Sequence, residues 1–265
     1  MQARAFRRPA AALLAVAFAV LPATGAQAAD SARTSGTGGS GSTTSHPSDP
    51  LVWGKLLYEE GCASCHGLQG QGIAPSPAIK DSGAAAVDFE VSTGRMPLGT
   101  IANQALRRAH SLYTAEETQA MAQYVATLGN GPAIPTQQVQ GWENADMALG
   151  GQVFRTNCAQ CHSFSGQGGA LTWGKQAPNL MKATPTQIYE AMLVGPNNMP
   201  KFSDQTLPPA EKRAVIKYIE FLRQPDNPGG LDLGRLGPVS EGLFGWFGGF
   251  GILVAIAIWI GVKAK

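Results

Sequence analysis

The residues with the clearest chemistry belong to two short motifs, one in each half of the chain. Each motif has the pattern Cys-x-x-Cys-His, and the residues concerned are Cys62, Cys65, His66, Cys158, Cys161 and His162. Cysteines three positions apart lie on one side of a helical turn, where two thiols reach the two vinyl groups of one porphyrin. The adjoining imidazole is then an axial ligand of the iron. The motifs therefore predict two covalently bound haem c groups, and they use all four cysteines of the chain.

Other uses of four cysteines are disulfide bonds, zinc binding and thiol exchange. The two pairs are much farther apart in the chain than the pairs of a zinc ribbon. Thiol exchange does not require a histidine directly after each pair. Haem attachment is the interpretation that explains this histidine in both places.

Helix caps predict the elements that lead into the motifs. A helix is expected to begin after Asp49, a capping residue that is followed by proline at the first helical position. A second start follows the segment 131–141, which is rich in Gly and Pro. The two starts align with Gly54 on Gly150, and the first cysteine of one motif aligns with the first cysteine of the other. The chain therefore contains an internal duplication.

Each unit also ends in an amphipathic helix. The first is opened by a capping box, Thr114-Ala115-Glu116-Glu117. Its apolar positions, at helical spacing, are Met121, Tyr124, Val125 and Leu128. The counterpart begins at Pro208-Pro209, and its matching positions are Val215, Tyr218, Ile219 and Leu222. Both apolar stripes are predicted to pack into the core of their unit.

Each unit resembles a class I cytochrome c domain, in which an N-terminal helix runs into the haem motif and a C-terminal helix crosses the first. Neither unit shows the alternating pattern of a strand. The expected fold is therefore all-α, with tandem domains at 49–130 and 142–226 joined by the linker 131–141. The haem would form much of each core, so that about 80 residues could fold with little apolar interior of their own.

The resemblance implies that a methionine, offered from a downstream loop, is the sixth ligand of each iron. Met96 and Met199 each precede a proline, which favours extended backbone, and they occupy the same relative place in their units. Met192 competes with Met199, but it falls in a helix predicted to open at Thr184 and to close at Gly195. The predicted axial ligands are His66, Met96, His162 and Met199.

Prolines after each motif have an implied part in orienting the histidines. By resemblance to cytochromes c, Pro75 and Pro178 would each place a backbone carbonyl on the imidazole and fix its tautomer. Pro77 lies close to Pro75 and is an alternative for the first domain. His110 offers bis-His ligation of the first haem as a further alternative. His/Met ligation leaves no open coordination position, so such an iron carries electrons rather than activating a substrate.

The N-terminus predicts export of the chain. Residues 1–29 have an arginine-bearing start, a short apolar run and the exit Ala26-Gln27-Ala28, as a secretory signal does. The apolar run is too short to span a bilayer comfortably, so cleavage near Ala28 is expected, with a retained anchor as the alternative. Residues 30–48 consist almost entirely of Ser, Thr, Gly and Ala, which predicts a flexible tether.

The C-terminus predicts one membrane anchor. After a juxtamembrane segment at 227–242, residues 243–262 carry no charge and are long enough to span a bilayer as a helix. Lysines in the tail 263–265 place that end in the cytoplasm and the haem domains outside it, at the cell membrane. Small residues that would allow close packing against another membrane helix are Gly245, Gly248, Gly249 and Gly251.

The composition agrees with a membrane-anchored chain. Hydrophobic residues make up 44% of the chain and charged residues only 14%, which is low for a soluble protein. The formal charge of +2 depends on the two ends, because residues 30–242 contain more acidic than basic side chains. Nothing in this distribution resembles a nucleic-acid-binding surface.

The assembled pattern resembles the dihaem cytochrome c subunit of the actinobacterial menaquinol:cytochrome c reductase, the cytochrome bcc complex. The likeness covers nearly all of 50–265 and is carried by the two motifs and by the segments 91–97, 195–200 and 237–242. It implies an electron-transfer subunit of a translocase, with no substrate-turnover site of its own. Its implied partners are the Rieske iron-sulfur protein, cytochrome b and the terminal cytochrome c oxidase of the respiratory chain.

Two other classes of function remain open from the sequence. A membrane-bound electron shuttle, or the cytochrome subunit of a dehydrogenase, would have the same ligands but no quinol-oxidising partner. A dihaem peroxidase would need one haem with a vacant or displaceable position, and two Met-Pro ligands argue against it.

Overall fold

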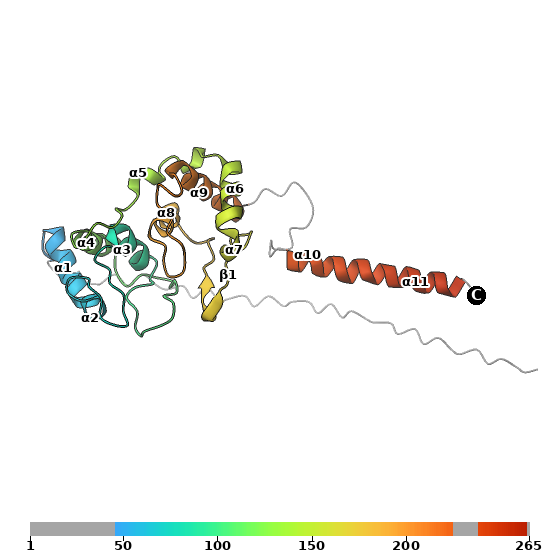
Figure 1. The fold of residues 1–265 in the computed structure, drawn as a ribbon, viewed down its shortest axis with the longest axis horizontal. Helices are drawn as coiled ribbons and strands as arrows, with labels where there is room; N and C mark the ends of the chain where they lie inside the picture. Colours follow the sequence, from blue (N-terminus) through green and yellow to red (C-terminus); the bar gives the residue numbers. More distant parts are fainter. Residues whose placement is uncertain (1–45, 225–237, 264–265) are drawn as a thin grey trace, which may run out of the picture. The chain divides into compact units, whose positions relative to one another are not determined.

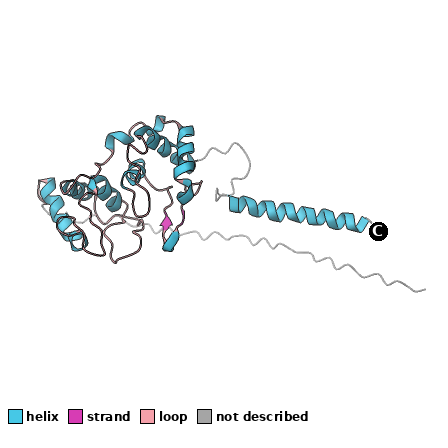
Figure 2. Ribbon diagram, in the orientation of Figure 1, coloured by secondary structure: helices cyan, strands magenta, loops and turns pink. Residues whose placement is uncertain are grey.

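The computed structural model of the chain describes residues 46–224 and 238–263. The predicted leader 1–29, most of the tether 30–48 and most of the juxtamembrane segment 227–242 lie outside these residues. Helices account for nearly all of the regular structure in the described part (Figure 2). The predicted helical fold is therefore confirmed, and two tandem helical domains are followed by one long apolar helix.

The first domain is built on two helices that begin where the caps predicted. The Asp49 side chain accepts a hydrogen bond from the Leu51 N–H, and Thr114 and Glu117 form the reciprocal capping box. The helices of this domain are α1 Pro50–Gly61, α2 Ala63–His66, α3 Gly83–Ser92 and α4 Ala115–Ala126 (Figure 1). A small apolar cluster between α1 and α4 centres on Tyr58, Tyr124 and Val125.

The second domain repeats this plan with additions. Its elements are α5 Thr136–Val139, η1 Trp142–Asn144, α6 Met147–Asn157, α7 Ala159–His162, β1 Gly169–Ala170, η2 Thr172–Gly174, β2 Gln176–Ala177, α8 Pro185–Val194 and α9 Pro209–Arg223. The strands β1 and β2 pair antiparallel, with Gly169 opposite Ala177. The sequence predicted no strand, because two residues are too few to show an alternating pattern. The larger core of this domain includes Phe154, Tyr189 and Ile216, all fully buried.

The crossing of the first and last helices is the same in both domains. A Cβ atom added at Gly54 in α1 would overlap the carbonyl oxygen of Ala120 in α4. A Cβ atom added at Gly150 in α6 would overlap the carbonyl oxygen of Ala214 in α9 in the same way. Glycine thus allows the two backbones of each pair to touch, and the matching contacts confirm the duplication.

The two domains contact each other through the packing of α3 on α8 and through polar bonds made by these helices and by the loop after α3. Gln104 donates from Nε2 to the carbonyl oxygen of Gln176 at 2.7 Å and accepts from the Gln176 N–H at 2.9 Å. Arg107 donates to Oε1 of Gln187 at 3.1 Å, and Gln187 donates to Oγ of Ser92 at 3.4 Å. Helix packing and these hydrogen bonds therefore join the two halves.

The C-terminal helix continues without interruption across the predicted span. Its parts are α10 Pro238–Phe244, the π-helical turn η4 Gly245–Phe250 and α11 Gly251–Lys263. Residues 239–263 are long and apolar enough to cross a membrane. The helix extends beyond both ends of the predicted range 243–262, because nothing in the flanking residues breaks it.

Candidate haem-binding sites

The two motifs form matching single turns of helix. The His66 N–H donates to the Cys62 carbonyl oxygen at 2.9 Å, and the His162 N–H donates to that of Cys158 at the same distance. This turn places both cysteines of each motif along one side, with the histidine directly after them. No disulfide bond joins any of the four cysteines, which all lie in the described residues. The arrangement is the one that the spacing predicted for thioether attachment.

Each histidine has one ring nitrogen bound to a proline carbonyl. Nδ1 of His66 lies 2.8 Å from the carbonyl oxygen of Pro77, and Nδ1 of His162 lies 2.9 Å from that of Pro178. A carbonyl oxygen only accepts, so Nδ1 carries the proton and the lone pair of Nε2 is free to bind a metal. Burial lowers the pKa of His162, with the bond to Pro178 acting in the opposite direction, and this favours the neutral ligand form.

The prediction for Pro178 is confirmed, whereas the prediction for Pro75 is wrong. The Ser76 N–H donates to the Ile73 carbonyl oxygen at 2.8 Å, which closes a turn that contains Pro75. The carbonyl oxygen that contacts the His66 imidazole therefore belongs to Pro77, two residues after Pro75. In the second domain the Lys175 N–H closes a turn on the Thr172 carbonyl oxygen at 3.3 Å, and this turn contains no proline, so the first proline after the motif is the one that contacts the histidine.

The first thiol of each pair is the more buried one. Burial, followed by the neighbouring Cys65, raises the pKa of Cys62 to about 11. Burial and Cys161 raise the pKa of Cys158 to about 12. Cysteines that exchange disulfides have lowered pKa values, because the thiolate is the reactive form. These thiols thus lack the electrostatic setting of a thiol-exchange enzyme.

The two Met-Pro segments lie in loops that begin with a left-handed glycine. Gly94 has φ of +67° and Gly195 has φ of +61°, and a side chain at Gly195 would press on the Met199 carbonyl. The side chains of Met96 and Met199 are both partly buried. Each is placed in non-helical backbone, as the following proline predicted.

The alternative ligands are placed differently. Met192 lies in α8, is 3% exposed and is packed among the core side chains of the second domain. The helix begins and ends where the caps predicted, at Thr184 and Gly195. His110 lies in a loop of the first domain and is exposed, while its carbonyl oxygen packs against Gly94. This placement favours Met199 over Met192 as a ligand offered from a loop.

The residues present fit a haem in two further respects. Loops of the first domain leave several large apolar side chains at least half exposed, which is typical of a surface that another apolar group covers. These side chains are Leu68, Ile73, Ile101, Leu106 and Leu112. Arg95 is only 6% exposed, yet its Nη1 has no hydrogen-bond partner. It is a donor available to an acidic group of a cofactor.

The buried polar residues around the methionine loops could not be recognised from the sequence. Arg95 lies over the ring of Phe89 at 4.6 Å, and the Met96 N–H donates to the Glu90 carbonyl oxygen at 3.0 Å. Burial raises the pKa of Glu90 to about 7, against the effect of Arg95. In the sequence, the only indication of these buried polar residues was the charged Arg95 directly before Met96-Pro97. In the second domain, Lys175 of the β1–β2 connection donates to Asn198, next to Met199.

Models of known families match the two domains separately. Residues 52–129 match the family "Cytochrome c", and residues 145–219 match "Cytochrome C oxidase, cbb3-type, subunit III". Each match contains one motif and the methionine predicted to go with it. The assignment of two cytochrome c domains is confirmed, and their Cys-x-x-Cys pairs imply covalent haem c.

Similar proteins span most of the chain. The "Cytochrome bc1 complex cytochrome c subunit" of Corynebacterium efficiens is 43% identical over 226 residues, which are 80% of this chain and 76% of the relative. The protein of the same name from Corynebacterium diphtheriae is 42% identical, and that of Mycobacterium tuberculosis is 41% identical, again over 80% of this chain. The chain therefore belongs to the family of cytochrome c subunits of the actinobacterial cytochrome bc1 complex, and it is an electron carrier of the respiratory chain.

Proposed function

We propose that the chain carries two haem c groups and relays electrons from the Rieske iron-sulfur protein of the complex to a terminal cytochrome c oxidase. Covalent attachment is assigned to Cys62, Cys65, Cys158 and Cys161, and axial ligation to His66, Met96, His162 and Met199. When bound, each haem c supplies a centre that gains and loses one electron. The protein holds the two centres and keeps both of them in one chain.

The observation that carries this proposal is the pair of matched ligand settings. In each domain a proline carbonyl binds Nδ1 of the motif histidine, and a methionine is offered from a loop after a left-handed glycine. Two axial side chains on one iron leave no position for a substrate, and a thioether ligand raises the reduction potential relative to a second imidazole. Both properties suit electron transfer.

The joined domains support a relay within one chain. The bonds from Gln104 to Gln176 and from Arg107 to Gln187 hold the two halves together. A chain with two fixed centres can connect two enzymes without a separate soluble cytochrome. The order of the two centres is left to experiment.

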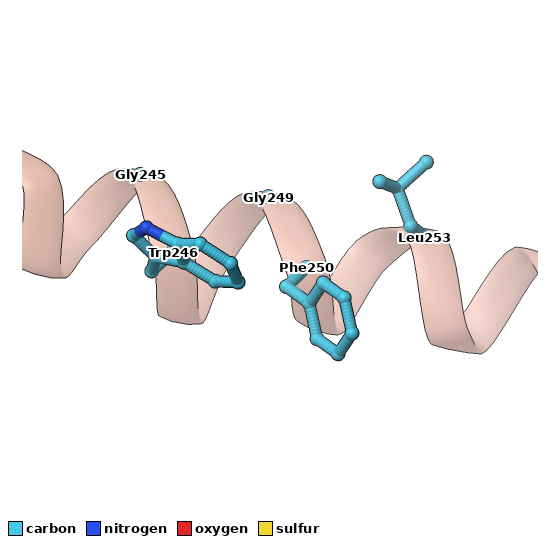
Figure 3. Close-up of a pocket in the computed structure, with 5 residues that line it drawn as sticks. All are labelled: Gly245, Trp246, Gly249, Phe250 and Leu253. Atoms are coloured by element: carbon cyan, nitrogen blue, oxygen red, sulfur yellow. The ribbon is translucent and has the colours of Figure 1, made fainter.

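The C-terminal helix is proposed as the membrane anchor and as a contact with cytochrome b. Figure 3 shows a shallow surface hollow on this helix, lined by Gly245, Trp246, Gly249, Phe250 and Leu253. Gly245 and Gly249 lie one turn apart, beside the packed rings of Trp246 and Phe250, so the backbone of another helix could approach closely there. Substituting leucine for Gly249 should lower the amount of cytochrome b that co-purifies with the chain.

The relay is tested by changing one axial ligand at a time in the complete complex. Met96→His and Met199→His should each lower the reduction potential of one haem, because bis-His ligation favours the oxidised iron. Both haems should stay attached, since the cysteines are intact, and menaquinol oxidation should slow. Met147→His is the matched control, because Met147 is 42% exposed and is not a proposed ligand.

Two results would contradict the proposal. If neither ligand substitution changed turnover, the chain would not lie on the path of the electrons. If a dehydrogenase co-purified with the chain after mild solubilisation, in place of the Rieske protein, cytochrome b and the oxidase, the proposed partners would be wrong.

A further inference from the structure

The second domain contains a buried lysine that the haem chemistry above does not use. Lys212 in α9 has no exposed surface, although lysine is almost never fully buried unless it is paired. Its Nζ donates to Oδ1 of Asp204 at 2.6 Å and to the carbonyl oxygen of Leu207 at 2.9 Å. Tyr189 in α8, also fully buried, donates from its hydroxyl to the same Asp204 oxygen at 3.1 Å. We call Lys212, Tyr189 and Asp204 the Lys212 network.

The Lys212 network is not expected to add stability over an apolar core. Taking a lysine out of water carries a large desolvation penalty, and a well-packed apolar side chain of similar volume is often at least as stabilising. The Asp204 side chain is still 45% exposed, so water weakens its attraction for the lysine. A gain other than stability is therefore expected, and buried ionic pairs are best known for fixing one geometry among several.

The geometry that the network fixes is that of the segment after Met199. Asp204 and Leu207 both belong to the loop that returns from Met199 to α9, and both are bound by Lys212. The same loop is held nearer the methionine by Phe202, whose N–H donates to the Met192 carbonyl oxygen at 2.7 Å. The Met192 carbonyl and the Tyr189 side chain of α8, together with Lys212 of α9, thus hold this loop at successive points beyond the ligand.

The first domain has no such arrangement at the equivalent position. The helix crossings align Ala120 with Ala214, so Lys212 corresponds to Thr118. Thr118 is 2% exposed, and its hydroxyl donates at 2.8 Å to the carbonyl oxygen of Thr114, which caps the same helix. It therefore contributes no bond to the loop of Met96.

We infer that Lys212, together with Tyr189 and Asp204, is a positioning residue that holds Met199 in place as an axial ligand. At the equivalent position of the first domain, Thr118 does not do this for Met96. The inference rests on the proposed ligation of the second haem by Met199. A thioether is a weak, neutral ligand for oxidised iron, so the loop that carries it decides how readily another ligand replaces it. The two haems should then differ in how easily they exchange methionine for an added ligand.

The test is a titration of the oxidised, full-length chain with imidazole. In Lys212→Met, imidazole should bind the second haem about tenfold more tightly than in the wild type, since the two hydrogen bonds from the Lys212 ammonium group no longer hold the loop. The long-wavelength absorption of methionine-ligated oxidised haem should weaken, and one of the two reduction potentials should fall. Tyr189→Phe should shift all three readouts in the same direction by less.

The controls separate positioning from folding and from ligand identity. Thr118→Val, at the matched position of the first domain, should change none of these readouts. A folded Lys212→Met chain with a lower melting temperature but wild-type imidazole affinity would overturn the inference, because a purely structural role predicts that result. If Lys212→Met does not fold, unchanged imidazole affinity in both Tyr189→Phe and Asp204→Asn would overturn it instead. Met199→Ala must remove the methionine absorption of one haem, and its failure to do so would overturn the ligand assignment as well.

Discussion

Glu190 is a buried acid at the contact between the two domains. It is fully buried in α8, and neither of its carboxylate oxygens has a partner with hydrogen-bond geometry. Burial, and after it the nearby carboxylate of Asp88 in α3, raise the pKa of Glu190 to about 10. The two acids occupy the same position in helices of equal length, so the duplication itself brings them face to face. At neutral pH, Glu190 therefore carries a proton.

This residue predicts a pH-dependent stability. An acid whose pKa is raised by folding stabilises the folded state fully below its ordinary value of 4.5, and it loses that contribution as the pH rises toward about 10. The melting temperature of the wild type should thus fall between about pH 5 and pH 9. In Glu190→Gln the amide does not titrate, so the fall should be smaller.

Circular dichroism of both proteins across this pH range provides the measurement. Glu90, with a pKa of about 7, titrates in both proteins, so the difference between them isolates Glu190. Identical slopes for the two proteins would show that Glu190 is already ionised in the folded wild type.

At the residue scale, the sequence predicted the helical turns of the two motifs, but it did not predict the buried charges. The cysteines and histidines follow from a fixed local spacing, which a helical turn reproduces in both domains. Pro77 was missed in favour of Pro75 because the deciding turn depends on tertiary folding. Lys212 precedes the apolar stripe of α9 and would be expected in solvent, and only the approach of Asp204 from a loop explains its burial.

Among the secondary-structure elements, the crossing of α1 with α4 and that of α6 with α9 set the shape of each domain. Gly54→Ala should place a methyl group against the Ala120 carbonyl and push the helices apart, at a cost of about 1–3 kcal/mol in the free energy of unfolding. Gly150→Ala should have a similar effect on the second domain. Guanidinium chloride unfolding of the haem-loaded chain measures both.

The control for this prediction is Gly99→Ala. Gly99 has no atom within 4 Å of an added Cβ, so the substitution should leave the free energy of unfolding nearly unchanged. Equal effects of Gly54→Ala and Gly99→Ala would mean that helix contact is not what makes glycine necessary at the crossing.

The elements that the sequence revealed are those with caps or periodic apolar residues. Helices α1, α4 and α8 begin at the predicted capping residues, and α9 begins at the predicted prolines. Helix α3 was not predicted, because it has no side-chain cap and its alanine-rich sequence has no clear apolar face. The strands β1 and β2 are too short for any periodic signal.

On the scale of the whole molecule, one helix is proposed to bind the chain to the membrane. Residues 239–263 form a helix of sufficient length and apolar character. A chain that ends at residue 237 should therefore leave the membrane fraction while retaining both haems, which haem staining of separated fractions would measure. If the shortened chain stayed with the membrane, the N-terminal leader would be a retained anchor instead of a cleaved signal.

The bonds between Gln104 and Gln176 and the packing of α3 on α8 have a kinetic consequence. Two redox partners that meet by diffusion exchange electrons more slowly in glycerol, and charged partners also respond to added salt. The two halves of this chain are already in contact, so electron exchange between them should be insensitive to solvent viscosity. In flash photolysis experiments, a higher glycerol content of the buffer should therefore slow only the steps that bring in another protein.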